Sequence, residues 1–502
     1  MHRTLTVTLL AASLVYTTLA PTSARAHDDR DGGSKTATPI KHLVVIFDEN
    51  NAFDHYFGTY PLAANPDGEP QFHPSPDTPA VNGLTTALLQ HNPNAANPFR
   101  LDRSQALTCD NDNHYTDEQK AYDGGLLDKF NFTSAVGPGC LPNLAMGYYD
   151  GNTVTALWNY AQHYAMSDNF FDTEFGTTVM GHLNLITGQT HGTTSKDIAG
   201  KIVNGSVIAN VQPILDDCPG ATPRITMTGK NVGDLLNAAN VTWGWFYGDF
   251  GATSITGGVA TCVAEYNSHY DPFQYYASTS NPHHLPPSSV AMIGKADQAN
   301  HQYDLTSFWQ ALANGNLPAV SFLKAPVTET GHPSDSTPLA EQEFLVNTIN
   351  MLESSPYWHD MAIIITYDDS DGWYDHVMPP IVNQSNDPAN DSLLGPVGLC
   401  GTPQPGAYLD RCGYGERLPF LVISPFAKRN FVDHSINDTT SILRFIEDNW
   451  SLGRIGDQSF DALSGSILGM FDFDDRDGHR DRRDADDRRL FLDPSTGERI
   501  GW

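Results

Sequence analysis

Positive charge is scarce in this sequence. Its 502 residues include 28 lysines and arginines against 59 aspartates and glutamates, so the formal net charge is −31 at pH 7. A surface of this sign repels nucleic acids and anionic lipids at long range, and we therefore expect no nucleic-acid partner. A site for a phosphate ester would need a local cation to reverse this field.

Long apolar runs are absent after residue 26, and a membrane-spanning helix requires about 20 apolar residues. Residues 1–26 combine a basic start, the apolar run "LTVTLLAASLVYTTLA" and a terminal "ARA". This pattern predicts a cleaved signal peptide. A membrane anchor is the alternative, but threonines and Pro21 interrupt the run. We expect a periplasmic or secreted protein without stable membrane insertion. Cleavage would remove two arginines and change the net charge to −33.

Cysteine is also infrequent, and no two cysteines form a C-x-x-C pair, which argues against a zinc site built from thiolates. An even number of cysteines in an exported protein favours disulfide bonds. Six cysteines allow 15 pairings, of which pairing between nearest neighbours is one, and the sequence leaves the choice open. The six are Cys109, Cys140, Cys218, Cys262, Cys400 and Cys412.

Short apolar runs alternate with helical patterns along much of the chain. The runs, which are typical of strands buried on both faces, span residues 42–47, 318–323, 361–366 and 419–424. Apolar residues recur at helical spacing in residues 306–315, 339–355 and 439–450. This alternation predicts an α/β fold with a mostly parallel central sheet and helices on both faces. The less regular segments 61–100 and 195–300 are interpreted as insertions that form a lid or a smaller subdomain.

The two ends of the chain are predicted to lie outside this fold. Residues 27–39, "HDDRDGGSKTATP", are typical of a flexible leader. Residues 475–502 begin within a dense mixture of arginines and aspartates and are interpreted as a charged tail. A calcium loop is the alternative at this end, but arginines interrupt its acidic residues.

Polar clusters follow all four predicted strands. Ligands of open α/β sheets bind outside the carboxyl ends of the strands, so these clusters are candidate site residues. They comprise Asp48, Glu49 and Asn50 after the first run, Lys324 and His332 after the second, Asp368, Asp369, Asp371, Asp375 and His376 after the third, and His434 after the fourth. Carboxylates gathered at one sheet edge repel one another, and a bound divalent cation with oxygen ligands would resolve that repulsion.

A candidate nucleophile occurs in "DTEFGTTVMGHLNLITGQTHG", residues 172–192. The pattern predicts a loop that leads into a helix, where backbone N–H groups and the helix dipole attract an anion. A hydroxyl at that junction, from Thr177 or Thr178, would become nucleophilic beside a metal ion. A helix N-cap is the ordinary alternative for either threonine.

Five ordered blocks between about residues 40 and 474 resemble a family of bacterial phosphoesterases. That family includes AcpA-type acid phosphatases and non-zinc phospholipases C, and it belongs to the alkaline-phosphatase-like superfamily. The blocks are "VVIFDENNAFDHYFGTYP", "EFGTTVMGHLNLITGQTHG", "ITYDDSDGWYDHVMPP", "LPFLVISPFAKRNFVDHSINDTTSILRFIEDNW" and "DQSFDALSGSILGMFDF". The resemblance implies an alkaline-phosphatase-like fold and a catalytic domain over residues 40–474.

The resemblance also implies roles for individual residues. Glu49, Asn50, Asp368 and Asp369 match positions that bind one divalent metal ion, whose identity stays open. Thr178 matches the Ser or Thr that becomes phosphorylated. His114, His269 and His332 match positions that bind phosphoryl oxygens or serve the leaving group. Two departures stand out, because Asp48 replaces a usual Gln, and Thr177 and Met180 replace prolines of the nucleophile loop.

The function implied is that of a secreted, metal-dependent hydrolase of phosphoric esters. The block "YDDSDGWYDH" resembles the acid phosphatases more than the phospholipases C, which favours phosphomonoester substrates and a phospho-threonine intermediate. The alternative is a phosphodiesterase of the phospholipase C type that acts on phosphocholine or phosphoinositol lipids. A third hypothesis is a non-catalytic protein that binds cations through the acidic cluster. The oligomeric state is left open.

Overall fold

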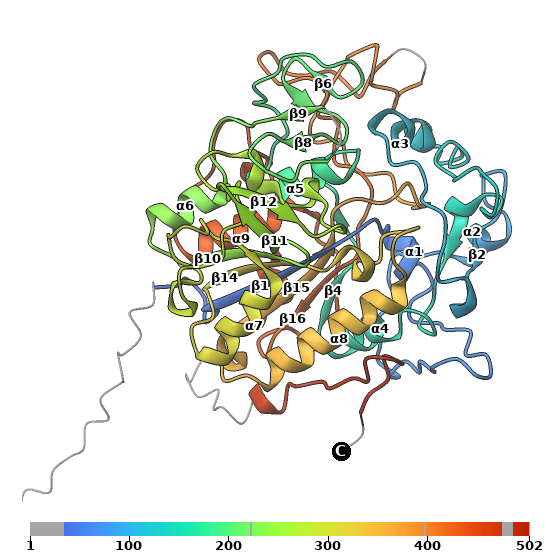
Figure 1. Cartoon of the computed structure of the whole chain (residues 1–502). Coiled ribbons are helices and arrows are strands. Elements are labelled where there is room, and N and C mark those ends of the chain that lie inside the picture. Colours follow the sequence, from blue (N-terminus) through green and yellow to red (C-terminus); the bar gives the residue numbers. More distant parts are fainter. Residues whose placement is uncertain (1–34, 221–222, 396–397, 474–484, 501–502) are drawn as a thin grey trace, which may run out of the picture. The chain divides into compact units, whose positions relative to one another are not determined.

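The computed structural model describes residues 35–220, 223–395, 398–473 and 485–500 (Figure 1). The predicted signal peptide and most of the predicted leader lie outside the described residues. Among the described helices, none is both long enough and apolar enough to cross a bilayer.

The described residues contain an eight-stranded sheet in the order β13-β10-β14-β1-β15-β16-β4-β17. Strand β16 runs antiparallel to its two neighbours, and the other neighbouring pairs are parallel. The strands are β1 (His42–Asp48), β4 (Ala165–Ser167), β10 (Trp243–Tyr247), β13 (Gln302–Asp304), β14 (Val320–Lys324), β15 (Met361–Tyr367), β16 (Phe420–Ile423) and β17 (Phe431–Asp433). This is the α/β fold with a mostly parallel sheet that the sequence predicts.

Helices cover both faces of this sheet (Figure 1). On one face α5 contacts α6 and α9, and on the other face α4 contacts α8. The helices are α1 (Phe53–Phe57), α2 (Thr86–Gln90), α3 (Tyr115–Tyr122), α4 (Thr155–His163), α5 (Thr178–Thr187), α6 (Val232–Ala238), α7 (Leu305–Asn314), α8 (Pro338–Ser354) and α9 (Thr440–Asn449).

Short paired strands lie in the segments that connect the main helices and strands. The pairs are β2 (Phe99–Arg100) with β3 (Gly147–Tyr148), β5 (Phe170–Phe171) with β18 (Asn437–Asp438), β6 (Ile202–Val203) with β7 (Ser206–Val207), β8 (Gln212–Pro213) with β9 (Arg224–Ile225), and β11 (Ala252–Thr256) with β12 (Val259–Cys262).

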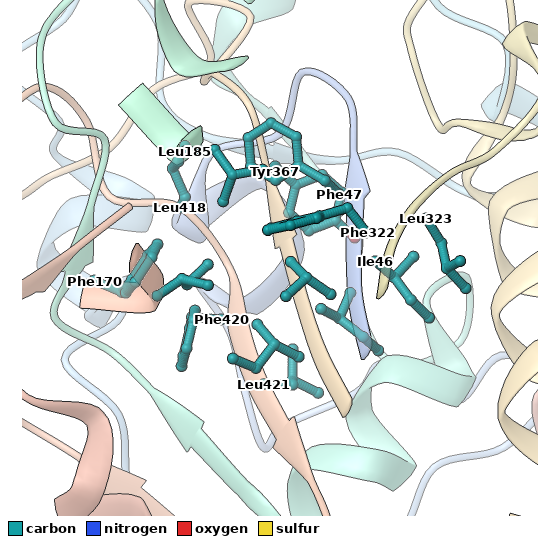
Figure 2. Packing of buried hydrophobic residues seen from close by; sticks show 14 of the residues in the cluster. Ile46, Phe47, Phe170, Leu185, Phe322, Leu323, Tyr367, Leu418, Phe420 and Leu421 are labelled. Carbon is teal, nitrogen blue, oxygen red and sulfur yellow. The ribbon is translucent and has the colours of Figure 1, made fainter. Parts of the chain in front are cut away.

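The core lies between the sheet and its two helical layers. The seven residues of β15 are all buried, as are the last six of β1, because apolar side chains on both faces of these strands meet helices. Figure 2 shows side chains of β1, β14 and β16 packed in one cluster, among them Ile46, Phe322 and Phe420. Burial on both faces fixes the strand ends, and with them the polar residues that follow.

Most of the predicted elements are present. The runs 42–47 and 361–366 lie in the parallel strands β1 and β15, the run 318–323 overlaps the parallel strand β14, and the three predicted helices correspond to α7, α8 and α9. The run 419–424 forms β16, but the expectation that it ends at the same sheet edge as the others was wrong, because β16 is antiparallel. His434 instead follows β17, where it contacts Asp168 at 2.8 Å.

Two segments differ from their expected character. The middle of the predicted insertion 195–300 supplies β10, which pairs with β14 in the central sheet, so this segment belongs partly to the core. The described part of the expected tail, residues 485–500, packs against the domain. Leu492 is fully buried, and the Leu490 N–H donates to Glu353 of α8.

The six cysteines pair as nearest neighbours. The bonds join Cys109 to Cys140, Cys218 to Cys262 and Cys400 to Cys412, with Cα–Cα distances of 5.6, 6.0 and 5.8 Å. The structure thus selects one of the 15 pairings that the sequence leaves open.

A buried charge cluster joins α1 to the loop after β15 and to the residues before β16. The guanidinium of Arg417 contacts Asp375 at 3.0 Å and Asp54 at 3.2 Å, and His376 Nδ1 lies 2.6 Å from Asp54. Burial alone would lower the pKa of His376, but the Asp54 carboxylate outweighs it and the pKa is raised. For Asp54, burial would raise the pKa, but His376 and Arg417 lower it.

This cluster predicts a pH-dependent loss of stability in the variant His376→Gln. A raised folded pKa means that the charge on His376 stabilises the fold below its ordinary pKa of 6.5, and that this contribution is lost as pH rises through the folded value. Replacement should lower the free energy of unfolding by about 2 kcal/mol near pH 5.5 and by less near pH 9. Denaturant unfolding at both pH values measures this, with His359→Gln at an exposed histidine as control. An equal loss at both pH values would contradict the assignment.

Candidate metal centre and nucleophile

The candidate site lies at the carboxyl ends of three adjacent parallel strands, β14, β1 and β15. Asp48 of β1 pairs with Tyr367 of β15, so Glu49 and Asp368 leave the sheet side by side. Lys324 ends β14, on the other side of β1. Residues that are some 320 positions apart in the sequence are therefore neighbours because the strands are in register.

The carboxylates of Glu49 and Asp368 belong to one fully buried group of charged side chains. Lys324 forms an ion pair with Glu49 through its ammonium group. His182 of α5 lies between the two carboxylates, with Nε2 3.9 Å from Glu49 and Nδ1 3.5 Å from Asp368. Ligand atoms of Glu49, His182 and Asp368 all lie within 4.8 Å of one another, an arrangement that could hold a metal ion.

Asn50 is held by hydrogen bonds that leave its amide oxygen without a partner among the described residues. Its backbone N–H donates to Asp368 Oδ1 at 3.0 Å, and its Nδ2 donates to Asp371 Oδ1 at 2.9 Å. The φ angles of Asn50 and Asp371 are 56° and 54°. Asn and Asp are the non-glycine residues that tolerate this left-handed region best. The turn that orients the side-chain carbonyl of Asn50 thus forms without a glycine.

Asp369 connects the loop after β15 to the candidate nucleophile. Its Oδ2 accepts a hydrogen bond from Asn113 Nδ2 at 3.0 Å and lies 3.4 Å from Thr178 Oγ1. Its Oδ1 accepts from the backbone N–H of Asp371 at 2.8 Å. The structure therefore brings all four sequence-predicted metal ligands, Glu49, Asn50, Asp368 and Asp369, together with Thr178.

The chemistry of these groups fits a divalent cation. Within the described residues, Glu49 Oε2, Asn50 Oδ1 and Asp368 Oδ2 are buried oxygens without a hydrogen-bond partner. Burial and then the charge of Asp368 raise the pKa of both Glu49 and Asp369. Unpartnered buried oxygens and crowded carboxylates are unfavourable unless a cation is bound, and a set of oxygens suits a hard divalent ion.

Thr178 is the first residue of α5, and Thr177 is its N-cap. The helix packs very closely on the loop after β15, since a Cβ on Gly181 would lie 1.8 Å from the carbonyl oxygen of Asp368. Only glycine permits that approach, and the approach fixes the position of Thr178 relative to Asp369. Glu118 of α3 links the loop before Thr178 to the loop after Asp369. Its carboxylate accepts hydrogen bonds from the Gly176 N–H at 2.7 Å and from Ser370 Oγ at 2.8 Å.

The three predicted histidines differ in their surroundings. Burial, then the charges of His332 and Lys324, lower the pKa of His269 to about 3, so His269 is neutral in the free site over most of the pH range. His332 Nδ1 contacts its neighbouring carbonyl, that of Pro333, at 2.6 Å. His114 is mostly exposed, and its hydrogen bond to Asp112 raises its pKa.

Sequence reasoning missed several polar residues of the site. His182 lies one helical turn after Thr178, and that spacing was the signal that could have revealed it. Asn113 directly precedes His114, but it is the Asn113 side chain that reaches Asp369. Lys324 was noted as a strand-end residue without a role. Nothing in the local sequence indicates the contacts of Glu118.

Asp48, which the sequence could not place, belongs to the opposite side of the sheet. Both of its carboxylate oxygens are buried and unpartnered among the described residues, and the causes of its raised pKa are burial and then Glu341 of α8. Glu341 in turn accepts hydrogen bonds from Tyr56 and Tyr367. Asp48 is therefore next to the predicted metal ligands in sequence, but it interacts with a separate buried carboxyl group.

Comparison with known proteins gives relatives of low identity and broad coverage. The chain is 24% identical over 454 residues to a non-hemolytic phospholipase C of Pseudomonas aeruginosa, covering 86% of this chain and 57% of that protein. It is 25% identical over 463 residues to phospholipase C B of Mycobacterium tuberculosis, covering 87% and 78%. The chain thus spans less than two thirds of the Pseudomonas relative.

A solved structure of a protein in the alkaline phosphatase superfamily from Vibrio parahaemolyticus is 12% identical, with a TM-score of 0.32 over 84% of this chain and 71% of that one. The profile of the Phosphoesterase family matches residues 40–453, a range that contains Glu49, Thr178 and Asp369. The chain belongs to the phosphoesterase family.

Proposed function

We propose that this chain hydrolyses phosphoric esters by transferring the phosphoryl group to Thr178 and then to water. The observation that carries the proposal is the position of the Thr178 hydroxyl. It lies at the N-terminus of α5, 3.4 Å from Asp369 and beside a cluster of buried, unpartnered oxygens. A hydroxyl at a helix N-terminus faces the end of the helix dipole that attracts anions.

The metal-binding part of the proposal assigns one divalent ion to Glu49, Asn50, Asp368 and Asp369. When bound, such an ion neutralises phosphoryl oxygens and favours the deprotonated form of a nearby hydroxyl. The buried ammonium of Lys324 balances part of the charge of Glu49. This local positive charge allows a phosphate ester to approach a protein whose net charge is −31.

The remaining steps use side chains around the centre. Thr178 Oγ1 gives its proton to Asp369 Oδ2, which lies 3.4 Å away, and attacks phosphorus in line, which forms a phospho-threonine and breaks the bond to the leaving alkoxide. His269 or His332 donates a proton to that alkoxide. For His269, whose pKa is about 3 in the free site, the charge of the bound phosphate must first raise the pKa. His114, whose pKa is raised, supports binding of the anion at the rim. Water then hydrolyses the phospho-threonine.

Replacing Thr178 tests the nucleophile. Thr178→Val keeps the shape of the side chain but removes the hydroxyl, so turnover of p-nitrophenyl phosphate should fall by about 10³-fold or more. Thr177→Ala, one residue away, is the matched control and should keep most of the activity, although Thr177 also has a buried hydroxyl without a partner among the described residues. Loss of activity in Thr177→Ala with retention in Thr178→Val would reverse the assignment.

Replacing a ligand tests the metal assignment. Asp368→Asn removes one charge with little change in shape, so the purified protein should retain well below half of the divalent metal found in the unchanged protein, as measured by elemental analysis. Asp433→Asn, at the end of β17, serves as a control that should leave the metal content unchanged. Full metal content in Asp368→Asn would contradict the proposed ligand set.

For the substrate we propose phosphomonoesters, as hydrolysed by acid phosphatases. The alternative, a phosphodiesterase of the phospholipase C type, is supported by the names of the relatives. Kinetics with p-nitrophenyl phosphate and p-nitrophenyl phosphorylcholine distinguish the two. The proposal expects kcat/KM to be about tenfold or more higher for the monoester. A preference for the phosphorylcholine substrate would favour the phospholipase alternative, and metal retention without hydrolysis of either would favour a cation-binding protein.

A further inference from the structure

Residues 207–212, in the predicted insertion, lie beside the candidate nucleophile and one of the predicted histidines. The side chain of Asn210 accepts a hydrogen bond at 3.0 Å from the N–H of Val179, the residue after Thr178. Two residues later, Nε2 of Gln212 lies 3.0 Å from Nδ1 of His269. The insertion therefore contributes polar side chains to the candidate site.

His269 belongs to a short 3-10 helix, Ser268–Tyr270, that contacts α5. Tyr270 stacks on His182 of α5, with ring centroids 5.8 Å apart, and the ammonium of Lys324 lies 4.8 Å from the centre of the same tyrosine ring. Both partners of Tyr270 belong to the buried charged group of the candidate site. The imidazole of His269 is thus held next to that group, and it is half-buried, so part of the ring is accessible.

The hydrogen bonds around Gln212 determine which atom of its amide faces this imidazole. The hydroxyl oxygen of Ser268 accepts from the Gly220 N–H at 3.1 Å, so its own hydrogen is available for Gln212 Oε1, which lies 2.6 Å away. Because its oxygen accepts that bond, Gln212 directs its Nε2 donor to His269 Nδ1. A ring nitrogen that accepts a hydrogen bond carries no hydrogen itself.

The hydrogen of the neutral His269 ring must therefore be on Nε2. A neutral imidazole has one N–H, and the hydrogen bond at one ring nitrogen determines the state of the other. The Asn267 side chain, whose Nδ2 lies 3.4 Å from His269 Nε2, has no other hydrogen bond among the described residues. Rotation of this amide places its oxygen on the Nε2–H, and such a long contact leaves the N–H available to a ligand.

We propose that Gln212 is a positioning residue that holds His269 in the Nε2–H tautomer, so that this N–H donates to a phosphoryl oxygen of the substrate. The inference rests on the proposed function and selects one of the two roles that the family resemblance leaves for His269. Burial, and then the facing charges of His332, Lys324 and Lys201, lower the pKa of His269 and disfavour a second proton on the ring. A neutral donor of this kind keeps its hydrogen over a wide pH range and is oriented before charge develops on the phosphoryl group.

His332 has the opposite arrangement. Its Nδ1 contacts the Pro333 carbonyl at 2.6 Å, and a carbonyl oxygen only accepts, so Nδ1 carries the hydrogen and Nε2 can take up and release a proton. The two histidines differ in chemistry because their partners differ. His332 is therefore suited to protonate the leaving alkoxide, and His269 is suited to bind the phosphoryl group without changing its own protonation state.

Nuclear magnetic resonance of the full-length protein labelled with ¹⁵N-histidine tests the tautomer without requiring turnover. Two-bond ¹H–¹⁵N correlations show which ring nitrogen carries hydrogen, and the signals of His269 are those that His269→Gln lacks. Near pH 8 we expect Nε2–H in the unchanged protein and Nδ1–H in Gln212→Glu, because a carboxylate accepts from Nδ1. Gln310→Glu, the same change at an exposed position of α7, should keep Nε2–H.

Kinetics with p-nitrophenyl phosphate measures the consequence for the reaction. Gln212→Glu should lower kcat/KM by about tenfold or more near pH 8 and by less near pH 5, where a ring paired with a carboxylate takes up a proton and regains Nε2–H. Gln212→Met, which removes the donor but keeps the length of the side chain, should lower kcat/KM by a smaller factor that is similar at both pH values. Gln310→Glu should match the unchanged protein.

Inorganic phosphate separates a failure of this inference from a failure of the proposed function. It binds without turnover and should shift the Nε2–H signal of His269, and a shift without hydrolysis of any phosphoric ester would contradict the proposed function alone. Nδ1–H in the unchanged protein, no shift of the His269 signal with phosphate, or full kcat/KM in Gln212→Glu near pH 8 would each overturn the role of Gln212.

Discussion

The concentration of buried negative charge at the carboxyl ends of β14, β1 and β15 is the constraint on which the site depends. Glu49, Asp368 and Asp369 are fully buried, and within the described residues Lys324 is the cation paired with them. Parallel strands in register force these groups together whatever their mutual repulsion. The fold therefore favours the binding of a cation. Burial of the apolar residues of the sheet supplies the free energy that keeps the carboxylates in place.

The candidate nucleophile is positioned by packing as much as by hydrogen bonding. Gly181 lets α5 lie against the backbone of Asp368, and Glu118 links the loop before Thr178 to the loop after Asp369. These contacts come from three different parts of the chain. Because each one fixes a backbone position, the relation between the hydroxyl and the carboxylates is set by rigid elements, which is the usual requirement for a precise site.

Buried carboxylates with raised pKa values recur in this protein outside the candidate active site. Asp48 interacts with Glu341 on the other side of the sheet, and Asp410 lies among Asp387 and Asp391. The three groups differ in what neutralises them. Lys324 supplies part of the charge at the candidate active site, tyrosine hydroxyls donate to Glu341, and the pKa of Asp410, raised to about 8, favours its neutral form near pH 7. A strongly acidic composition thus has local consequences that the net charge alone does not reveal.

The sequence by itself determined the principal strands and helices and the α/β class, and it placed polar clusters at the strand ends, because apolar periodicity and strand-end position are local properties. The proposed ligand set within those clusters followed from the family resemblance. It could not determine that β16 is antiparallel, that β10 lies inside a presumed insertion, or that Asp48 and Glu49 interact on different sides of the sheet. Those features depend on strand order and register. The tertiary structure alone also brought in His182, Asn113 and Glu118, since contacts between distant segments leave no local pattern in the chain.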